Sequence, residues 1–135
     1  MCIRSLFHFL LVLLALASSF PPAVAQWSSD PTANNAVSLA SGGQDSPAMT
    51  SDGTGGVIIA WRDFRSGTTY DVYAQRIDSN GVMQWTANGV AISTAAHDQA
   101  SAVIVSDGAG GAIIAWEDTR GITGTDIYAQ RISPT

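Results

Sequence analysis

The stretch QDSPAMTSDGTGGVIIAWRDFRSGTTYDVYAQRI, residues 44–77, returns at residues 99–132 as QASAVIVSDGAGGAIIAWEDTRGITGTDIYAQRI. A shift of 55 residues aligns 44–80 with 99–135 without a gap, and 20 of the 37 aligned positions are identical. A fixed period of this length is the signature of a repeat architecture. We therefore divide this region into repeat 1 at 44–98 and repeat 2 at 99–135, in which the last strand of the unit is missing.

A weaker match extends the pattern toward the N-terminus. Gln26-Trp27 resembles Gln84-Trp85, and Val37-Ser38-Leu39 resembles Val90-Ala91-Ile92, with a few residues of slack. We expect residues 26–43 to form a partial repeat, a lone copy of the last strand of the unit.

Each repeat consists of short apolar runs between turn residues. Asp-Gly and Gly-Gly pairs supply the positive φ angles that hairpins need. After residue 25, Val and Ile together number 17 against a single Leu, and side chains branched at Cβ favour strands. The sequence predicts an all-β fold of two tandem four-stranded antiparallel repeats, with strands at 46–51, 56–63, 71–77 and 82–85 continuing to 90–93, and at 101–106, 111–118 and 126–132.

The second run of repeat 1 is apolar on both faces. Val57, Ile59 and Trp61 point one way, while Ile58 and Ala60 point the other, so we expect this strand to be covered on both sides. We expect residues 102–105 to be covered on both sides as well. Small sheets with two apolar faces must stack on copies of themselves, which is the arrangement of β-propeller blades.

The repeated string Ser-Asp-Gly…Ile-x-Ala-Trp…Asp-x-Arg…Asp-Val/Ile-Tyr-Ala-Gln-Arg-Ile resembles repeats of large secreted bacterial proteins of unassigned function. Its layout is also similar to TolB-type propeller blades. The resemblance covers residues 26–135 and implies a propeller architecture, without implying one function. The spacing from Asp78-Ser79-Asn80-Gly81 to Trp85 does not match the Asp-box of sialidase blades.

Eight strands make only two blades, too few to close a propeller ring. Two explanations stay open. The chain is a piece of a longer repeat protein, which we favour, or two-blade chains associate as a homo-oligomer into a ring.

Residues 1–25 predict an export signal. A positive start is followed by an apolar run at 6–17, broken only by His8, and then by Ala23-Val24-Ala25, a small-x-small cleavage pattern. The run is too short to span a membrane. Cleavage before Gln26 leaves a chain with no Cys, no Lys and a net charge of −6, which argues against nucleic acid as a partner. We expect a secreted, cell-surface or periplasmic location.

The candidate ligand-binding residues are Asp63, Arg65, Asp118, Arg120 and Trp85. Arg forks onto carboxylates in two-pronged fashion, so the Asp-x-Arg pairs most simply hold a loop, and a repeated ligand site is the alternative. Trp85 is a candidate binding platform, as is Trp27, whereas Trp61 and Trp116 are expected in the core.

Other polar residues have simpler interpretations. Asp52 and Asp107 could bind Ca²⁺, but a turn role is favoured. His97 is expected in a solvated loop. Among the positions that differ between the repeats are Arg62 against Glu117, Phe64 against Thr119 and Tyr70 against Thr125. We expect no catalytic residue, no metal and no cofactor.

The expected function is a non-enzymatic extracellular module for binding, adhesion or scaffolding, with a protein or carbohydrate ligand. The alternatives are a fragment of a sialidase- or glycosidase-type propeller enzyme and a two-blade, lectin-like unit that forms a ring.

Overall fold

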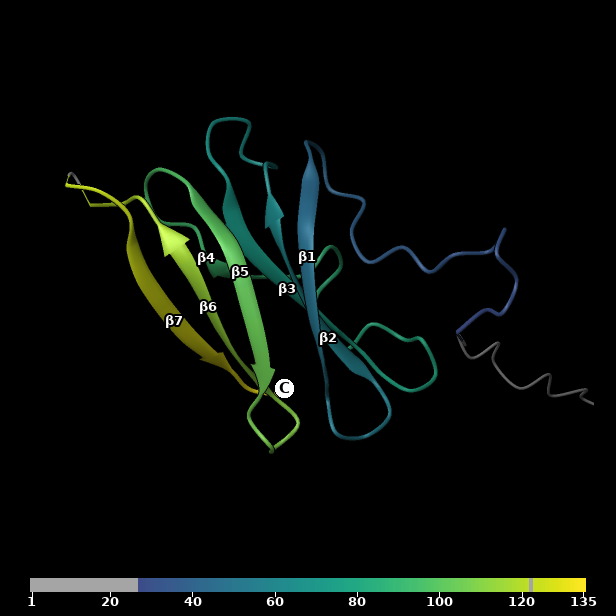
Figure 1. Ribbon diagram of the computed structural model, residues 1–135. Coiled ribbons are helices and arrows are strands. Elements are labelled where there is room, and N and C mark those ends of the chain that lie inside the picture. The colour runs from purple at the N-terminus through teal and green to yellow at the C-terminus, as the bar shows by residue number, and fades with distance from the viewer. Residues whose placement is uncertain (1–26, 122) are drawn as a thin grey trace, which may run out of the picture.

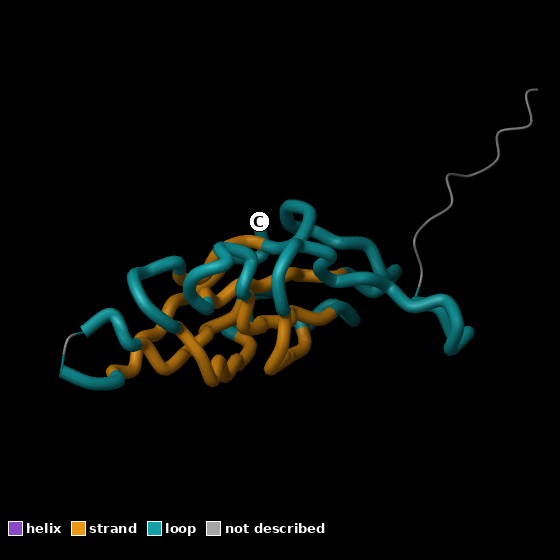
Figure 2. Tube along the Cα trace, turned by 90° about the horizontal axis from the view of Figure 1, so that it is seen from above, coloured by secondary structure: helices purple, strands orange, loops and turns teal. Residues whose placement is uncertain are grey.

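The computed structural model describes residues 27–121 and 123–135; the predicted export signal lies outside them. In this part the chain is all-β and contains no helix (Figure 2). The seven strands are β1 (Gln44–Ser51), β2 (Val57–Asp63), β3 (Asp71–Ile77), β4 (Val90–Ser93), β5 (Gln99–Ser106), β6 (Ala112–Asp118) and β7 (Asp126–Ile132). Accordingly, no helix suited to crossing a membrane occurs among the described residues.

The strands form two antiparallel sheets (Figure 1). The first sheet has the order β1-β2-β3-β4, and the second has the order β5-β6-β7. The second repeat even copies an irregularity of the first, because β1 and β5 each carry a bulge, after Asp45 and after Ala100. At these bulges Ser46 and Ser101 have φ angles of 52° and 53°. The predicted pair of antiparallel repeats is therefore confirmed.

Each first hairpin is closed by an aspartate that bonds its own turn. Asp52 Oδ1 accepts hydrogen bonds from the N–H groups of Thr54 and Gly56, both at 2.8 Å. Asp107 binds the matching turn of repeat 2 in the same way. A Cβ on Gly56 would lie 2.6 Å from Oδ2 of Asp52, so this turn requires glycine at that position.

The two sheets pack face to face. Ala60, Val72 and Ala74 of the first sheet form one buried cluster with Ile114 and Trp116 of the second. We call the side of a sheet that carries Ala60 and Ala74, or their counterparts Ala115 and Ala129, the alanine face. The side that carries Trp61, or Trp116, is the tryptophan face. The alanine face of the first sheet thus covers the tryptophan face of the second.

The prediction that both repeats are covered on both sides is correct only for the first. Every residue from Ile58 to Trp61 is buried, because the second sheet lies on one side and residues near Val37 lie on the other. In β5, by contrast, Val103 and Val105 are exposed. No third sheet exists among the described residues to cover them.

The expected lone strand at 26–43 is not formed in the described residues 27–43, which run as a loop beside the first sheet (Figures 1 and 2). Val37 packs on Ile59 and Trp61 of the tryptophan face. The indole N–H of Trp27 donates to the carbonyl oxygen of Asp78 at 3.2 Å. A strand needs an edge to pair with, and no sheet precedes the segment among the described residues.

The last strand of repeat 1 is also shorter than expected. Residues 82–85 make only an isolated bridge between Met83 and Ile77. The backbone N–H of Trp85 donates to Oε1 of Gln75 at 3.0 Å, so a side chain takes the place of the ladder partner. Only β4 pairs regularly with β3.

Candidate functional site

The Asp63–Arg65 pair closes the end of β2 against the following loop. Arg65 Nη2 lies 2.6 Å from Asp63 Oδ2, and Nε lies 2.9 Å from Oδ1. The indole N–H of Trp61 donates to the same carboxylate at 2.8 Å. The guanidinium stacks 3.6 Å above the ring of Tyr73, a favourable cation–π arrangement.

Repeat 2 builds the same cluster from Asp118 and Arg120. The indole N–H of Trp116 donates to Asp118 at 2.8 Å, and Arg120 Nη2 lies 2.5 Å from Asp118 Oδ2. Arg120 stacks 3.9 Å above Tyr128. Its Nη2 also donates to the hydroxyl of Ser93 at 3.1 Å, which ties the second sheet to β4.

Both carboxylates are fully buried and occupied by their own chain. Burial raises the pKa of Asp63, but hydrogen bonds from Arg65 and Trp61 outweigh it and lower that pKa. Hydrogen bonding from Arg120 above all, against the opposing effect of burial, lowers the pKa of Asp118 to about 2. Four of the five candidate ligand-binding residues thus form loop-holding ion pairs, and a ligand would have to break these pairs to reach the carboxylates.

Trp85, the fifth candidate, lies between the sheets. Its ring packs against the buried cluster of Ala60 and Trp116, and its indole N–H donates to the carbonyl oxygen of Pro134 at 3.2 Å. Trp27 is exposed. Trp61 and Trp116 are buried as expected.

Asp71 is a buried acid with a different environment. It pairs with Asp63 in the β2–β3 register. Burial first, and then the negative charges of Asp63 and Asp98, raise the pKa of Asp71, while Arg65 opposes the shift. Its counterpart Asp126 is exposed.

The turn aspartates are occupied as well. Oδ2 of Asp52 accepts from the hydroxyl of Thr54 at 2.8 Å and from Arg76 Nη2 at 3.0 Å. Burial raises the pKa of Asp52, but the hydrogen bonds from Thr54, Gly56 and Arg76 together lower it to about 2. No group of three or more metal-ligating side chains is found in residues 27–121 and 123–135.

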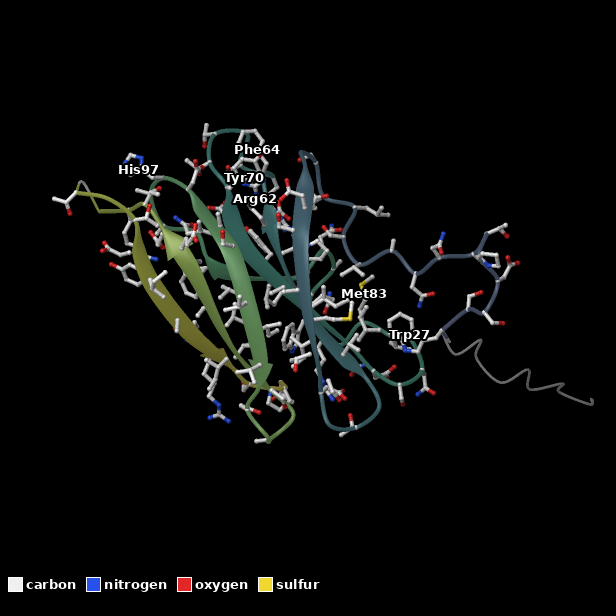
Figure 3. The ribbon with its side chains drawn as sticks, viewed as in Figure 1. Trp27, Arg62, Phe64, Tyr70, Met83 and His97 are labelled. Atoms are coloured by element: carbon white, nitrogen blue, oxygen red, sulfur yellow. The ribbon has the colours of Figure 1, made fainter. Side chains whose placement is uncertain are left out.

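Arg62, Phe64 and Tyr70, three of the residues that differ from their counterparts in repeat 2, come together at the loop end of the sheets (Figure 3). The rings of Phe64 and Tyr70 lie 4.8 Å apart. Arg62 stacks 4.0 Å above Tyr70 and makes a two-pronged ion pair with Asp45 at 2.8 and 2.9 Å. Together these four residues form a half-exposed aromatic and ionic cluster that repeat 2 lacks.

A polar groove of about 560 Å³ lies at the same end, between the β2–β3 loop of repeat 1 and the matching loop of repeat 2. Its lining residues are mostly polar: Thr68, Thr69, His97, Asp98, Thr119 and Gly121. Asp98 holds the two sides together, since its carboxylate accepts from the N–H of Tyr70 at 2.9 Å and its carbonyl oxygen accepts from the N–H of Thr119 at 3.0 Å.

The sequence alone does not place this groove. His97 and Asp98 belong to the connection between the repeats, while the other lining residues come from two loops 50 residues apart. The copies differ at 17 of the 37 aligned positions, and these differences include Arg62, Phe64 and Tyr70, which lie at the same end of the sheets but do not line the groove.

A second hollow of about 340 Å³ lies on the tryptophan face of the first sheet. Its walls are mainly apolar and include Val37, Pro47, Met49, Ile59 and Trp61.

Comparisons with known proteins give no relative to guide the assignment. Scans against protein-family models, curated proteins and solved structures found no match for this chain.

Proposed function

We propose that this chain is an exported, non-enzymatic repeat module of β-propeller type that binds a carbohydrate outside the cell. The observation that carries the proposal is the stacking of two equivalent sheets, alanine face on tryptophan face. Repetition of one such contact is how propellers and solenoids are built. The predicted export signal at 1–25 supports the extracellular location.

The groove between the loops is the proposed binding surface. The hydroxyls of Thr68 and Thr69 in the lining can donate and accept hydrogen bonds, the carboxylate of Asp98 accepts them, and the imidazole of His97 adds one of each when neutral. This mixture suits the hydroxyl groups of a sugar. The rings of Phe64 and Tyr70 lie on the loop beside it and offer apolar surface.

The buried acids favour binding over catalysis. A glycosidase of the usual kind needs two carboxyl groups on either side of a scissile bond. Asp63 and Asp118 are held in ion pairs inside the two sheets, and they recur in both repeats as structural pairs would.

A glycan microarray probed with labelled residues 26–135 tests the proposal. We expect selective binding that falls at least tenfold in His97→Asn and in Thr68→Ala. Asparagine at 97 tolerates the positive φ of 63° at that position. The matched control is Glu117→Ala, an exposed charge outside the groove. Failure of the wild-type chain to bind any glycan, or equal binding by all four proteins, would refute the carbohydrate assignment.

A further inference from the structure

The second sheet exposes the face that the first sheet buries. Ile58 and Val72 on the alanine face of the first sheet have 0% exposure, whereas the aligned Ile113 and Ile127 are 43% and 73% exposed. Val103 and Val105 add 64% and 58% exposed side chains to the same surface. Apolar side chains gathered on one face in this way mark an interaction site.

The complementary tryptophan face of the first sheet, at the opposite end of the chain, is only partly covered: residues near Val37 bury Ile59 and Trp61, while Pro47 and Met49 stay exposed. Pro47, Met49, Ile59 and Trp61 line the apolar hollow of the first sheet, and Met49 is 65% exposed. Their aligned counterparts are Ala102, Ile104, Ile114 and Trp116. In the second sheet all four of these pack in the interface with the first sheet.

One strand is missing at the junction where these faces would meet. β4 pairs with β3 and leads directly into β5. The fourth strand of the first sheet is therefore the segment that immediately precedes the second sheet in sequence. The edge of β7 has no such neighbour among the described residues. Residues 27–43 precede β1 as 82–98 precede β5, yet they form no strand, and Leu39 is 82% exposed.

We propose that a second copy of this chain docks head to tail. The tryptophan face of its first sheet covers the exposed alanine face of β5–β7, and its residues near Val37-Ser38-Leu39 pair with β7 as the fourth strand of that sheet. A second copy is the occupant because it supplies both missing parts in the arrangement that the chain already forms between its own sheets. Val37 corresponds to Ile92, since it packs on Ile59 and Trp61 as Ile92 packs against the buried cluster, and Leu39, two residues further along the added strand, lies on the same face.

One half of a polar contact at the junction between the two sheets also recurs in repeat 2. Arg76 binds Asp52 and extends Nη1 to the carbonyl oxygen of Pro134 at 3.3 Å. Arg131 binds Asp107 in the same way, but its side chain is 60% exposed. By the 55-residue shift, its target in a second copy is the backbone near Ser79.

The proposed contact joins two different surfaces, so it is heterologous. Each copy keeps one free half of the interface after binding the other. This geometry predicts association that continues until a ring closes, and it distinguishes the contact from a two-fold dimer, in which one face would bind itself.

The test is the mass of purified residues 26–135 in solution, measured by light scattering over a range of concentrations. We expect masses above that of one chain for the wild type and for the control Thr123→Asp, an exposed position outside both faces. Ile127→Asp and Met49→Asp should each remain single chains, with circular dichroism unchanged. When Ile127→Asp and Met49→Asp are mixed, they should form a 1:1 complex and associate no further, because each variant retains the binding face that the other has lost.

A wild-type chain that stays monomeric would overturn the proposal. So would masses that neither substitution lowers, or a mixture of the two variants that does not pair. Leu39→Ser tests the added strand: it should weaken association at least tenfold while leaving the melting temperature of monomeric Ile127→Asp unchanged. The inference rests on the blade stacking of the proposed function and not on the groove, so glycan binding by monomeric Ile127→Asp tests the two separately.

Discussion

The guanidinium of Arg65 turns back onto the carboxylate of Asp63, two residues earlier, and continues to the carbonyl oxygen of Asn88 at 2.8 Å. One side chain thus joins the end of β2 to the segment that leads into β4. Asp63 is fully buried, so the pair lies where the loss of one partner leaves an uncompensated charge.

Asp63→Ala should lower the free energy of unfolding by about 3 kcal/mol, because Arg65 would then be half-buried without its anion. Urea denaturation measures this change. The control is Asp126→Ala, an exposed aspartate, for which a change within about 0.5 kcal/mol is expected. Equal effects of the two substitutions would contradict the structural role of the pair.

Acid should destabilise the protein between about pH 4 and pH 2. The pKa values of Asp52 and Asp118 fall from 3.8 to about 2 in the folded chain. A carboxyl whose pKa is lowered by folding stabilises the protein above its unfolded pKa, and this contribution is lost as the pH falls through the folded pKa. Melting temperatures at pH 2, 3, 4 and 6 should therefore drop steeply at the acid end. Asp118→Asn should make the drop shallower, and a slope identical to that of the wild type would count against this origin.

Asp71→Asn should stabilise the protein at pH 7, whereas the loss of Asp63 should destabilise it. Folding raises the pKa of Asp71 through burial and the nearby charges of Asp63 and Asp98, so its ionised form opposes folding. The gain in melting temperature should be present at neutral pH and shrink as the pH falls, since protonation removes the same charge. Asp126→Asn, the exposed counterpart, serves as the control. A loss of stability at pH 7 would show that the Asp71 carboxylate contributes a favourable contact.

Gly89→Ala should cost about 3 kcal/mol of unfolding free energy, from backbone strain and overpacking together. Gly89 has a φ of +85°, and a Cβ there would lie 2.5 Å from Cη2 of Trp61. Gly67→Ala separates the two causes, because Gly67 has a φ of +74° with no heavy atom within 4 Å of an added Cβ. We expect this control to cost about 1 kcal/mol. Similar losses in urea denaturation would mean that contact with Trp61 contributes nothing.

The sequence was sufficient to place β1, β2 and β3 to within two residues, because the Asp-Gly and Gly-Gly pairs of 51–56 separate β1 from β2, and Ser66-Gly67 and Asn80-Gly81 flank β3. It failed at residues 82–85, where Gln75 replaces a ladder partner with its side chain. It also failed at residues 27–43, where a strand-like pattern is present but the segment pairs with no sheet edge in the described residues. Both errors depend on partners distant in the chain, which local periodicity does not report.

The functional residues, too, could be predicted only where their partners are close in the sequence. The repeated Asp and Arg residues were recognised as pairs, and their burial supports the loop-holding interpretation. The groove could not be assembled from sequence because Asp98 and Thr119 meet only through the folding of two loops around the connection. The three differences Arg62, Phe64 and Tyr70 were visible, but their convergence was not.

The alternation of alanine and tryptophan faces has a consequence for how such a chain can change its length. A further unit of about 55 residues inserted between repeats 1 and 2 would meet, at both of its surfaces, the kind of partner that the present sheets already provide. Its last strand would complete its own sheet while leading into the next unit, as β4 does. Gene duplication could therefore lengthen this protein by whole units without any new core having to evolve.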